Sequence, residues 1–329
     1  MTAHLDQIAQ KYPKIRFSLA PMEGVVDATM RHILTRVAKV DLCVTEFLRV
    51  TTQLYPNKVF YKNCPELLTD SHTASGVPVV LQLLGGQPTP MAENAARAVE
   101  LGAIGIDLNF GCPAKTVNNS DGGAALLQYT DRLYDIVAAV RRSVPDKIPV
   151  TAKMRLGFND RELMFENARA IEAGGAEKLT IHGRTKKDGY KPPADWEAIK
   201  QISDTISIPV VPNGDIGSVA AFEACHAIHG ATEYMLGRGL LANPGLIREL
   251  RSDNGKFSWS ELLPFILEFQ YAEMTIGLRK HQGHRLKQWL AYLKTHYAEA
   301  AVFFEQIKRL KEPELLEAAL LAEINKYPS

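Results

Sequence analysis

The stretch Ile104-Gly-Ile-Asp-Leu-Asn-Phe-Gly-Cys-Pro113 joins a short apolar run to a turn that carries one thiol, Cys112. Such a run is typical of a strand that is buried on both faces, as strands of parallel sheets are. Residues 114–123, which follow, are small and polar and end in two glycines, which let a backbone approach a ligand closely. Because α/β enzymes place reactive side chains just past the ends of buried strands, we expect Cys112 to lie in an active site.

Seven other stretches have the same β-type character, and helical patterns separate them along the chain. Together with the first stretch, the expected strands are residues 17–22, 41–48, 78–85, 104–109, 148–155, 177–183, 208–214 and 232–238. The expected helices between them include residues 90–101, 131–144, 161–173 and 218–228. Eight strands that alternate with helices over about 235 residues indicate an α/β fold, the (β/α)8 or TIM barrel.

The C-terminal part of the sequence has helical periodicity and no strand-like run. Ser258 and Glu261 form the pattern of a capping box, which opens a helix. The expected helices of this part are residues 258–278, 285–297, 299–310 and 314–324. We therefore expect a catalytic barrel over residues 1–254, in which residues 1–16 are an N-terminal extension, and an all-helical domain over residues 255–329.

The composition is that of an ordinary globular protein, with 46% hydrophobic and 23% charged residues. The formal net charge is only +1, so overall charge argues neither for nor against a nucleic-acid partner. No apolar run is long enough to span a bilayer, and residues 1–16 lack the apolar core of a signal peptide. Four scattered cysteines without a CxxC pair predict a reduced, cytoplasmic protein with no metal site.

Glycine-rich turns follow the last two expected strands, at Asn213-Gly214-Asp215 and Gly237-Arg238-Gly239. Turns at these places form a phosphate site in many barrels, through backbone N–H groups and a helix N-terminus. Arg238 can add a fixed positive charge to such a site. The alternative is that the glycines only permit tight turns.

Three polar residues in or at the ends of expected strands also permit two interpretations each. Lys153 lies in an otherwise apolar strand, either in a structural ion pair or against an electron-rich ligand, because a buried unpaired ammonium is costly. His182 is either a site residue or a hydrogen-bonded structural histidine. Gln82 is consistent with holding the edge of a flat heterocycle, although one amide proves nothing.

Cys112 has three interpretations. It could be a structural buried thiol, because Cys is often fully buried. It could be a nucleophile, although the sequence offers no clear Cys/His dyad. It could be a general acid, because a thiol of ordinary pKa is protonated near neutral pH. The residues alone leave acid and nucleophile open.

Several of these motifs, in this order, resemble the tRNA-dihydrouridine synthases. They are Pro21-Met22-Glu23-Gly24, Gln82-Leu-Leu-Gly85, Leu108-Asn-Phe-Gly-Cys-Pro113 with Lys115, Lys153-Met-Arg-Leu-Gly157, His182-Gly-Arg-Thr185, Asn213-Gly-Asp215 and Gly237-Arg-Gly239. The resemblance covers nearly the whole chain. Glu46-Phe-Leu-Arg49 and Lys287-Gln-Trp-Leu-Ala-Tyr292 resemble the bacterial C subgroup, which acts on uridine 16 in the tRNA D-loop.

The resemblance implies an FMN enzyme that reduces the C5–C6 double bond of a tRNA uridine to 5,6-dihydrouridine, with NADPH as reductant. It implies that hydride passes from reduced FMN to C6 while Cys112 protonates C5. The residues that it assigns to the FMN site are Pro21, Met22, Glu23, Gln82, Lys153, His182, Asn213, Gly214, Asp215, Gly237 and Arg238. No metal is implied.

A stacked uracil is inaccessible, so the target base has to be splayed out into the barrel mouth. The resemblance assigns contacts to this nucleotide to Arg49 and Asn109, and Tyr190 is a further candidate. Residues 279–311 contain eight basic side chains and only two glutamates, which can form an RNA-binding surface or a solvated helical face. With the barrel motifs present we favour RNA. The predicted tail contacts are Arg285, Lys287, Tyr292 and Lys308.

Two other functions are considered. The first is an FMN barrel oxidoreductase that acts on a free pyrimidine, as a dihydroorotate dehydrogenase-like protein does. A basic helical tail disfavours it, because a small substrate gives no reason for such a tail. The second is a tRNA-binding factor without catalysis, which an intact Cys112 and a complete flavin pocket disfavour. We expect a monomer that binds tRNA and no membrane.

Overall fold

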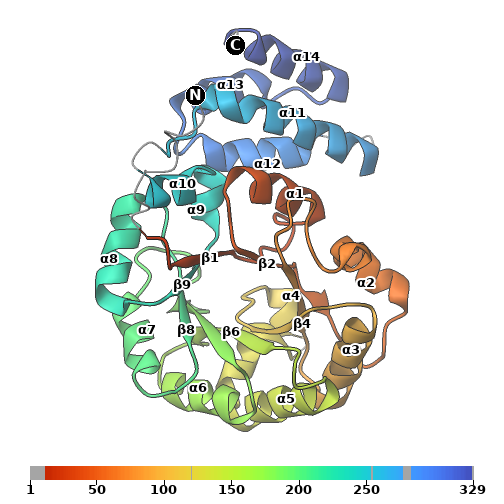
Figure 1. Cartoon of the computed structure of the whole chain (residues 1–329), viewed down its shortest axis with the longest axis vertical. Coiled ribbons are helices and arrows are strands. Elements are labelled where there is room, and N and C mark those ends of the chain that lie inside the picture. The colour runs from red at the N-terminus through yellow and green to blue at the C-terminus, as the bar shows by residue number, and fades with distance from the viewer. Residues whose placement is uncertain (1–11, 120, 253–254, 277–282, 328–329) are drawn as a thin grey trace, which may run out of the picture.

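The computed structural model describes residues 12–119, 121–252, 255–276 and 283–327. Parallel strands form a closed barrel, helices surround it, and a further group of helices stacks on one side (Figure 1). The strands are β1 Arg16–Leu19, β2 Leu42–Val44, β3 Leu48–Arg49, β4 Val79–Leu84, β5 Ile106–Phe110, β6 Val150–Gly157, β7 Lys178–Thr185, β8 Val210–Asn213 and β9 Glu233–Leu236.

Helices alternate with these strands. The barrel helices are α1 Ala28–Val37, α2 Asn57–Asn63, α3 Pro88–Glu100, α4 Lys115–Asn118, α5 Thr130–Ser143, α6 Met164–Ala173, α7 Trp196–Ser203, α8 Val219–His229, α9 Arg238–Ala242 and α10 Leu246–Arg251. Two 3₁₀ helices lie at Pro65–Thr69 and Gly123–Gln128. The later helices are α11 Trp259–Ile276, α12 His284–Leu293, α13 Ala298–Ile307 and α14 Pro313–Ile324.

Closure of the sheet follows from the strand pairing. β1 pairs in parallel with β9 and with β2, where Ser18 lies opposite Leu42, and β2 pairs with β4, where Cys43 lies opposite Val79. The expected strand 41–48 is divided into β2 and β3, both of which pair with β4. The prediction of a TIM barrel is confirmed, with the expected strands in the expected order.

β5, the strand of the opening stretch, is buried along its whole length. Successive side chains of a strand point to opposite faces. Ile106, Leu108 and Phe110 belong to the large apolar core. Asp107 and Asn109 point the other way, into the barrel, where both join a hydrogen-bond chain through Gln82 of β4. The apolar face anchors the strand, and the polar face carries the site.

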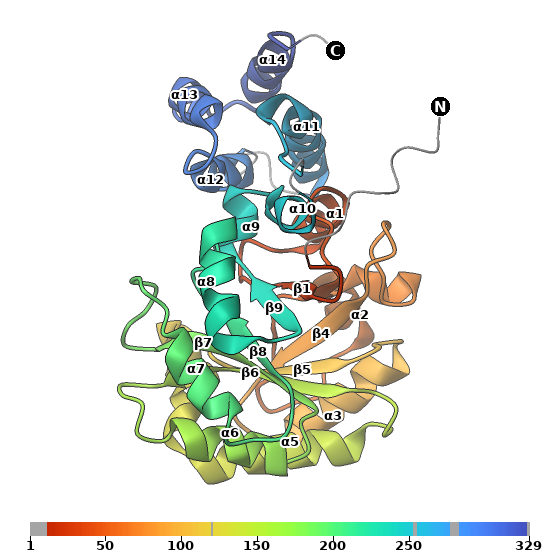
Figure 2. The same ribbon diagram turned by 60° about the vertical axis from the view of Figure 1, so that its left-hand side comes forward.

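The C-terminal segment α11–α14 is all helical and lies against one side of the barrel (Figure 2). The predicted capping box begins α11: the Glu261 N–H donates to Ser258 Oγ at 3.3 Å, and the Ser258 N–H donates to Glu261 Oε2 at 2.8 Å. α11 packs on α1, and α12 packs on α9. Trp289, which is 1% exposed, donates its indole N–H to Leu241 O at 3.2 Å and joins α12 to the barrel.

The expected domain boundary after residue 254 falls between α10 and α11, but the division into two domains stays a prediction. Of the expected extension 1–16, residues 1–11 lie outside the described residues. None of the helices in the described ranges combines the length and apolar character of a membrane span. Within the same ranges, no group of three or more His, Cys, Asp or Glu side chains could hold a metal ion.

Candidate active site

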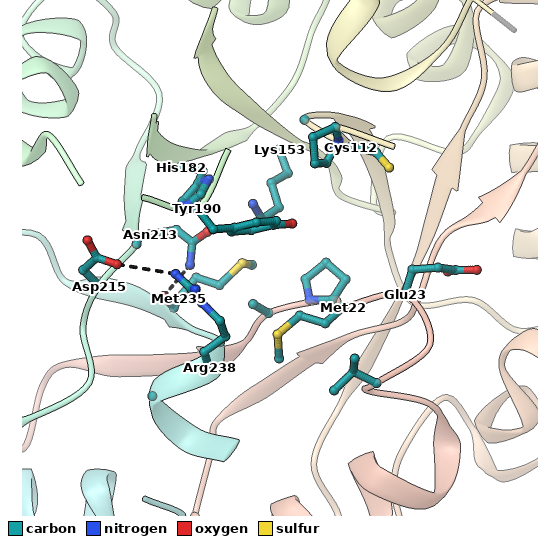
Figure 3. A pocket seen from close by; sticks show the side chains of 18 of the residues that line it. Met22, Glu23, Cys112, Lys153, His182, Tyr190, Asn213, Asp215, Met235 and Arg238 are labelled. Carbon is teal, nitrogen blue, oxygen red and sulfur yellow. Dashed lines mark hydrogen bonds and ion pairs between the residues drawn. The ribbon is translucent and has the colours of Figure 1, made fainter. Parts of the chain in front are cut away.

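A cavity of about 940 Å³ opens where the C-terminal ends of the strands meet (Figure 3). In a parallel barrel all these ends lie on one face, so residues far apart in sequence converge there. Cys112 lines the cavity, as does every residue that the sequence assigned to the cofactor. These are Pro21, Met22, Glu23, Gln82, Lys153, His182, Asn213, Gly214, Asp215, Gly237 and Arg238. Their roles stay predictions, but their positions meet one requirement of a common ligand site.

Cys112 is half-buried, whereas Cys43, Cys64 and Cys225 are buried away from the cavity. Burial raises the pKa of the Cys112 thiol above its ordinary value, and the charge of Glu23 adds to this effect. The thiol is therefore protonated at neutral pH. No histidine in the described part of the chain is hydrogen-bonded to it. This environment favours a proton donor over an activated nucleophile.

The turn that presents Cys112 is held by the side chain of Asn109. Asn109 Oδ1 accepts hydrogen bonds from the backbone N–H groups of Gly111 at 2.9 Å and Cys112 at 3.0 Å. Its Nδ2 donates to Gln82 Oε1 at 2.8 Å. Asn109, predicted to contact RNA, thus lines the cavity and also holds the turn that carries Cys112.

Lys153 presents a positive charge to the cavity. Its side chain makes no hydrogen bond or ion pair with the residues that the structure describes. Burial, with repulsion from Arg155, lowers the pKa of Lys153 to about 8. The alternative, a structural ion pair, is not observed, because no carboxylate of the described residues lies at bonding distance from the Lys153 ammonium. The charge of Asp107 nevertheless favours the ammonium form. The geometry leaves Lys153 available to an electron-rich ligand.

His182 is held neutral beside several cations. Burial lowers the pKa of His182 strongly, and Lys153, Arg155 and two further arginines act in the same direction. Arg184 Nη1 lies 3.2 Å from His182 Nε2. Because a guanidinium can only donate, Nε2 accepts, and the imidazole proton lies on Nδ1. His182 can therefore offer a neutral N–H donor.

The turn after β8 depends on both glycine and aspartate. Gly214 has φ +118°, and a Cβ there would lie 2.9 Å from Ala194 Cβ and 3.0 Å from a carbon of the His182 ring. Asp215 is bonded to Arg184 and accepts from the Ala194 N–H at 2.7 Å. Its other carboxylate oxygen lies 3.6 Å from Arg238. Asp215 thus fixes this wall of the cavity, and the 44%-exposed Arg238 side chain remains open to a ligand.

Two guanidinium groups lie close to the ring of Tyr190. Arg155 Cζ and Arg238 Cζ each lie 5.1 Å from the centre of its ring. Its ring centre is 6.0 Å from that of His182, and Figure 3 shows it within the cavity. Tyr190 is 54% exposed, so an aromatic face flanked by cations is available for stacking.

The other predicted RNA contacts differ in whether they line the cavity. Tyr292 of α12 lines the cavity, so the helical segment contributes one wall of the site. Arg49 does not line it, but its Nη2 donates to Thr116 O at 2.9 Å in the short helix α4 that follows Cys112. Lys287 donates to Leu310 O, and Lys308, just after the end of α13, pairs with Glu305.

Arg285 is engaged in contacts between the helical segment and the barrel. Its guanidinium donates to Gly24 O at 2.6 Å and Val25 O at 3.0 Å, and it lies 2.9 Å from the Asp27 carboxylate. Only 20% of its side chain is exposed. Its predicted contact with RNA stays untested, but its observed role is structural. Residues 279–282 of segment 279–311, among them the basic Arg279 and Lys280, lie outside the described residues.

The sequence interpretation did not assign two residues that shape the site. Arg155 lines the cavity and donates to Gly111 O at 2.8 Å, Thr185 O at 3.1 Å and Gly189 O at 2.9 Å. It therefore links the turn after β5 to the end of β7 and the loop that follows β7. Asp107 is bonded to Gln82 behind the cavity. The available signal for both was a charged side chain in an otherwise apolar strand.

Two solved structures resemble this chain in fold at low sequence identity. A 2-naphthoyl-CoA reductase complex superposes with a TM-score of 0.56 at 14% identity, over 73% of this chain and 50% of that chain. A variant of NCR from Zymomonas mobilis gives a TM-score of 0.51 at 15% identity, over 71% of this chain and 85% of that chain. At these identities the likeness extends to the fold alone.

The sequence comparisons are more specific. The family model described as dihydrouridine synthase (Dus) matches residues 18–326. A tRNA-dihydrouridine(16) synthase of Shewanella oneidensis is 47% identical over 300 residues, which is 91% of this chain and 95% of the relative. The same-named protein of Pseudomonas putida is 48% identical over 301 residues, with 90% and 93% covered. The chain therefore belongs to the dihydrouridine synthase family, a family of flavin-dependent oxidoreductases.

Proposed function

We propose that the protein reduces a D-loop uridine of tRNA, at position 16, to 5,6-dihydrouridine, with FMN as bound cofactor and NADPH as reductant. The observation that carries this proposal is the single cavity in which Cys112 and all eleven expected cofactor residues meet. The assignment to position 16 is supported by relatives that cover most of the chain and are named tRNA-dihydrouridine(16) synthases. A tRNA substrate would place the enzyme in the cytoplasm.

The residues around the cavity fit a flavin mononucleotide. The volume of about 940 Å³ lies within the range of pockets for ligands of this size. Lys153 would face an electron-rich part of the isoalloxazine, because its ammonium has no partner among the described residues. The turns at Gly214 and Gly237, with Arg238, would hold the phosphate through N–H groups and a guanidinium.

When bound, the flavin supplies the hydride that C6 of the uracil receives. Cys112 supplies the proton that C5 receives, so that one double bond is exchanged for two C–H bonds. Burial keeps the thiol protonated until that step, because it raises the pKa of Cys112. The hydrogen bonds from Gly111 and Cys112 to Asn109 hold the donor in place.

The target nucleotide would enter from the side of the cavity lined by Tyr190 and Tyr292. Tyr190 offers a ring face to a splayed base, and Arg49 and Asn109 would contact the nucleotide itself. The proposed tail contacts with RNA remain Arg285, Lys287, Tyr292 and Lys308. Among these, Tyr292 has the strongest support because it lines the cavity.

The test is a comparison of tRNA from cells with and without this protein, in which dihydrouridine is mapped at nucleotide resolution. We expect specific loss at position 16 when the protein is absent. Loss at another D-loop position would overturn the position, and an unchanged map would overturn the function. Purified protein should be yellow and should leave free orotate and uracil unreduced; turnover of either would favour an enzyme of free pyrimidines.

A further inference from the structure

Asp107 is a buried carboxylate that the proposed chemistry leaves without a role. It is 3% exposed and does not line the cavity. Its Oδ1 accepts from Thr151 Oγ1 at 2.6 Å, and its Oδ2 accepts from Gln82 Nε2 at 2.6 Å. Burying a charge is costly unless its partners are well placed, and a hydrophobic residue would suit an interior strand better. Its presence therefore points to a requirement beyond packing.

The hydrogen-bond chain that starts at Asp107 has a fixed direction. An ionised carboxylate can only accept, so the amide nitrogen of Gln82 has to face it. Gln82 then turns its oxygen to Asn109, whose Nδ2 donates at 2.8 Å. The oxygen of Asn109 is left to face the backbone N–H groups of Gly111 and Cys112, which it binds at 2.9 Å and 3.0 Å.

Both ends of this chain require the same direction. The N–H groups of Gly111 and Cys112 can only donate, and Asp107 in its ionised form can only accept. If the amides of Gln82 and Asn109 were both reversed, donors would face donors at the Cys112 turn, and oxygen would face oxygen at Asp107. Burial raises the pKa of Asp107 above its ordinary value, and the hydrogen bonds from Thr151 and Gln82 and the charge of Lys153 oppose this effect. The N–H groups of the turn fix the direction of the chain in either form, because a protonated Asp107 can donate from Oδ1 to Thr151 while Oδ2 still accepts from Gln82.

We propose that Asp107 is a positioning residue, which acts through Gln82 and Asn109 to hold the Gly111–Cys112 turn and so to aim the Cys112 thiol at the substrate base. This inference rests on the proposed role of Cys112 as proton donor. Asp107 itself touches neither the cavity nor the reacting atoms. The chain crosses three adjacent strands, because Gln82 lies opposite Asp107 and Asp107 lies opposite Thr151 in the sheet register.

The first test measures the Cys112 thiol directly and needs no substrate. Full-length protein is treated with iodoacetamide under native conditions, and modification of each cysteine is followed by peptide mass spectrometry. In Asp107→Ala we expect Cys112 to react about threefold to tenfold faster, because a released turn exposes the thiol and lets its pKa fall toward the ordinary value. Cys43, Cys64 and Cys225 are buried and report on folding, so their protection should not change.

Asp107→Asn is the conservative control. Its side-chain oxygen can still accept from Gln82, and its amide nitrogen can donate to the Thr151 hydroxyl oxygen. We expect it to keep the Cys112 reaction rate within about twofold of the wild type, because the direction of the chain is retained. An Asn variant as reactive as the Ala variant would overturn the proposed direction.

The second test is a double-mutant cycle on the half-reaction that consumes tRNA. We expect Asp107→Ala and Asn109→Ala each to slow oxidation of the reduced enzyme by tRNA by about tenfold to a hundredfold, because both release the proton donor. The double variant should be no slower than the slower single variant, since both act through one turn. Because Gln82 belongs to the expected FMN site, the comparison is between the two half-reactions: each single variant should slow oxidation by tRNA at least about threefold more than reduction of the flavin by NADPH, which does not need Cys112.

Three results would contradict the inference: unchanged Cys112 reactivity in Asp107→Ala, additive losses in the cycle, or equal losses in both half-reactions. If Asp107→Ala also exposes the three buried cysteines, Thr151→Val decides, because it removes one hydrogen bond and leaves the carboxylate. A selective rise at Cys112 in that variant supports the inference, and no rise contradicts it. Wild-type protein that never reduces tRNA would overturn the proposed function and leave the alkylation test standing.

Discussion

Positively charged side chains at the mouth of the barrel and in the helical segment α11–α14 differ in the partners that they have within the protein. At the mouth, Lys153 has no bonded partner among the described residues, and Arg238 is nearly half exposed beside a cavity. In the helical segment, Arg285 and Lys287 are occupied by carbonyl groups of the protein itself. A cation kept without a partner is costly to bury and indicates a ligand, whereas a cation with internal partners indicates structure.

The two regions also meet. Arg285 of α12 donates hydrogen bonds to Gly24 O and Val25 O. These two residues directly follow the cavity residues Met22 and Glu23. Tyr292, two turns further along α12, reaches the cavity itself. The helical segment therefore helps to form the site. The basic residues of segment 279–311 include structural cations as well as exposed ones.

The largest effect is expected at the mouth. Cys112→Ala should retain bound flavin and its reduction by NADPH, but should slow uridine reduction by about 10²–10⁴-fold, because no proton donor remains at C5. Stopped-flow absorbance of the flavin separates the two half-reactions. Turnover close to that of the wild type would remove Cys112 from the chemistry.

Arg285→Ala tests whether the helical segment is fastened as described. We expect a loss of about 1–3 kcal/mol in the free energy of unfolding, because the variant leaves the carbonyl groups of Gly24 and Val25 and the Asp27 carboxylate without their donor. Urea denaturation measures it. Arg309→Ala, at an exposed position of the same segment, is the matched control and should change stability by less than about 0.5 kcal/mol. Equal stability of both variants would show that Arg285 is no structural link.

The pH dependence of cofactor binding tests the unpartnered cation. With a pKa of about 8, Lys153 is charged below that pH and loses its charge above it. FMN affinity of the flavin-free protein should therefore fall as pH rises through this range, by about fivefold between pH 7 and 9 if the ion contact is worth one pKa unit. Fluorescence titration gives the affinity. Lys153→Met should bind more weakly and show no such slope; a parallel slope in the variant would assign it to another group.

The smallest effect is expected at the surface of the helical segment. Lys308→Ala should weaken tRNA binding by about twofold to threefold and reduce the salt slope by about 1, because one phosphate contact is lost. Filter binding at several salt concentrations measures both. Lys200→Ala on α7 is a matched control, since Lys200 pairs with Asp204 at the C-terminal end of its helix, much as Lys308 pairs with Glu305 at the C-terminal end of α13. Equal effects of the two variants would contradict an RNA contact at Lys308.

Local patterns in the sequence were sufficient for the barrel and for most of the site. Strand β7 begins within one residue of its expected start, and the capping box at Ser258 and Glu261 begins α11 as expected. These features depend on hydrophobic alternation and on contacts three residues apart. Because parallel strands share one mouth, correct strand ends were enough to bring the expected cofactor residues together.

Features that depend on distant contacts could not be predicted. One local boundary was also missed: the expected helix 161–173 begins only at Met164, because the Glu162 N–H donates to Asp160 within a turn. The link from Arg285 to residues 24–27 joins parts of the chain that no periodicity relates. The role of Asp107 requires the register of three strands, which the sequence of one strand does not contain.

The most direct measurement of the central claim uses purified protein and unmodified tRNA. Flavin-loaded wild type and Cys112→Ala are each incubated with NADPH and tRNA, and dihydrouridine is then mapped at nucleotide resolution. We predict dihydrouridine at position 16 with the wild type and almost none with the variant at equal enzyme and time. Equal dihydrouridine with both proteins, or none with the flavin-loaded wild type, would contradict the claim that the cavity around Cys112 carries out the reaction.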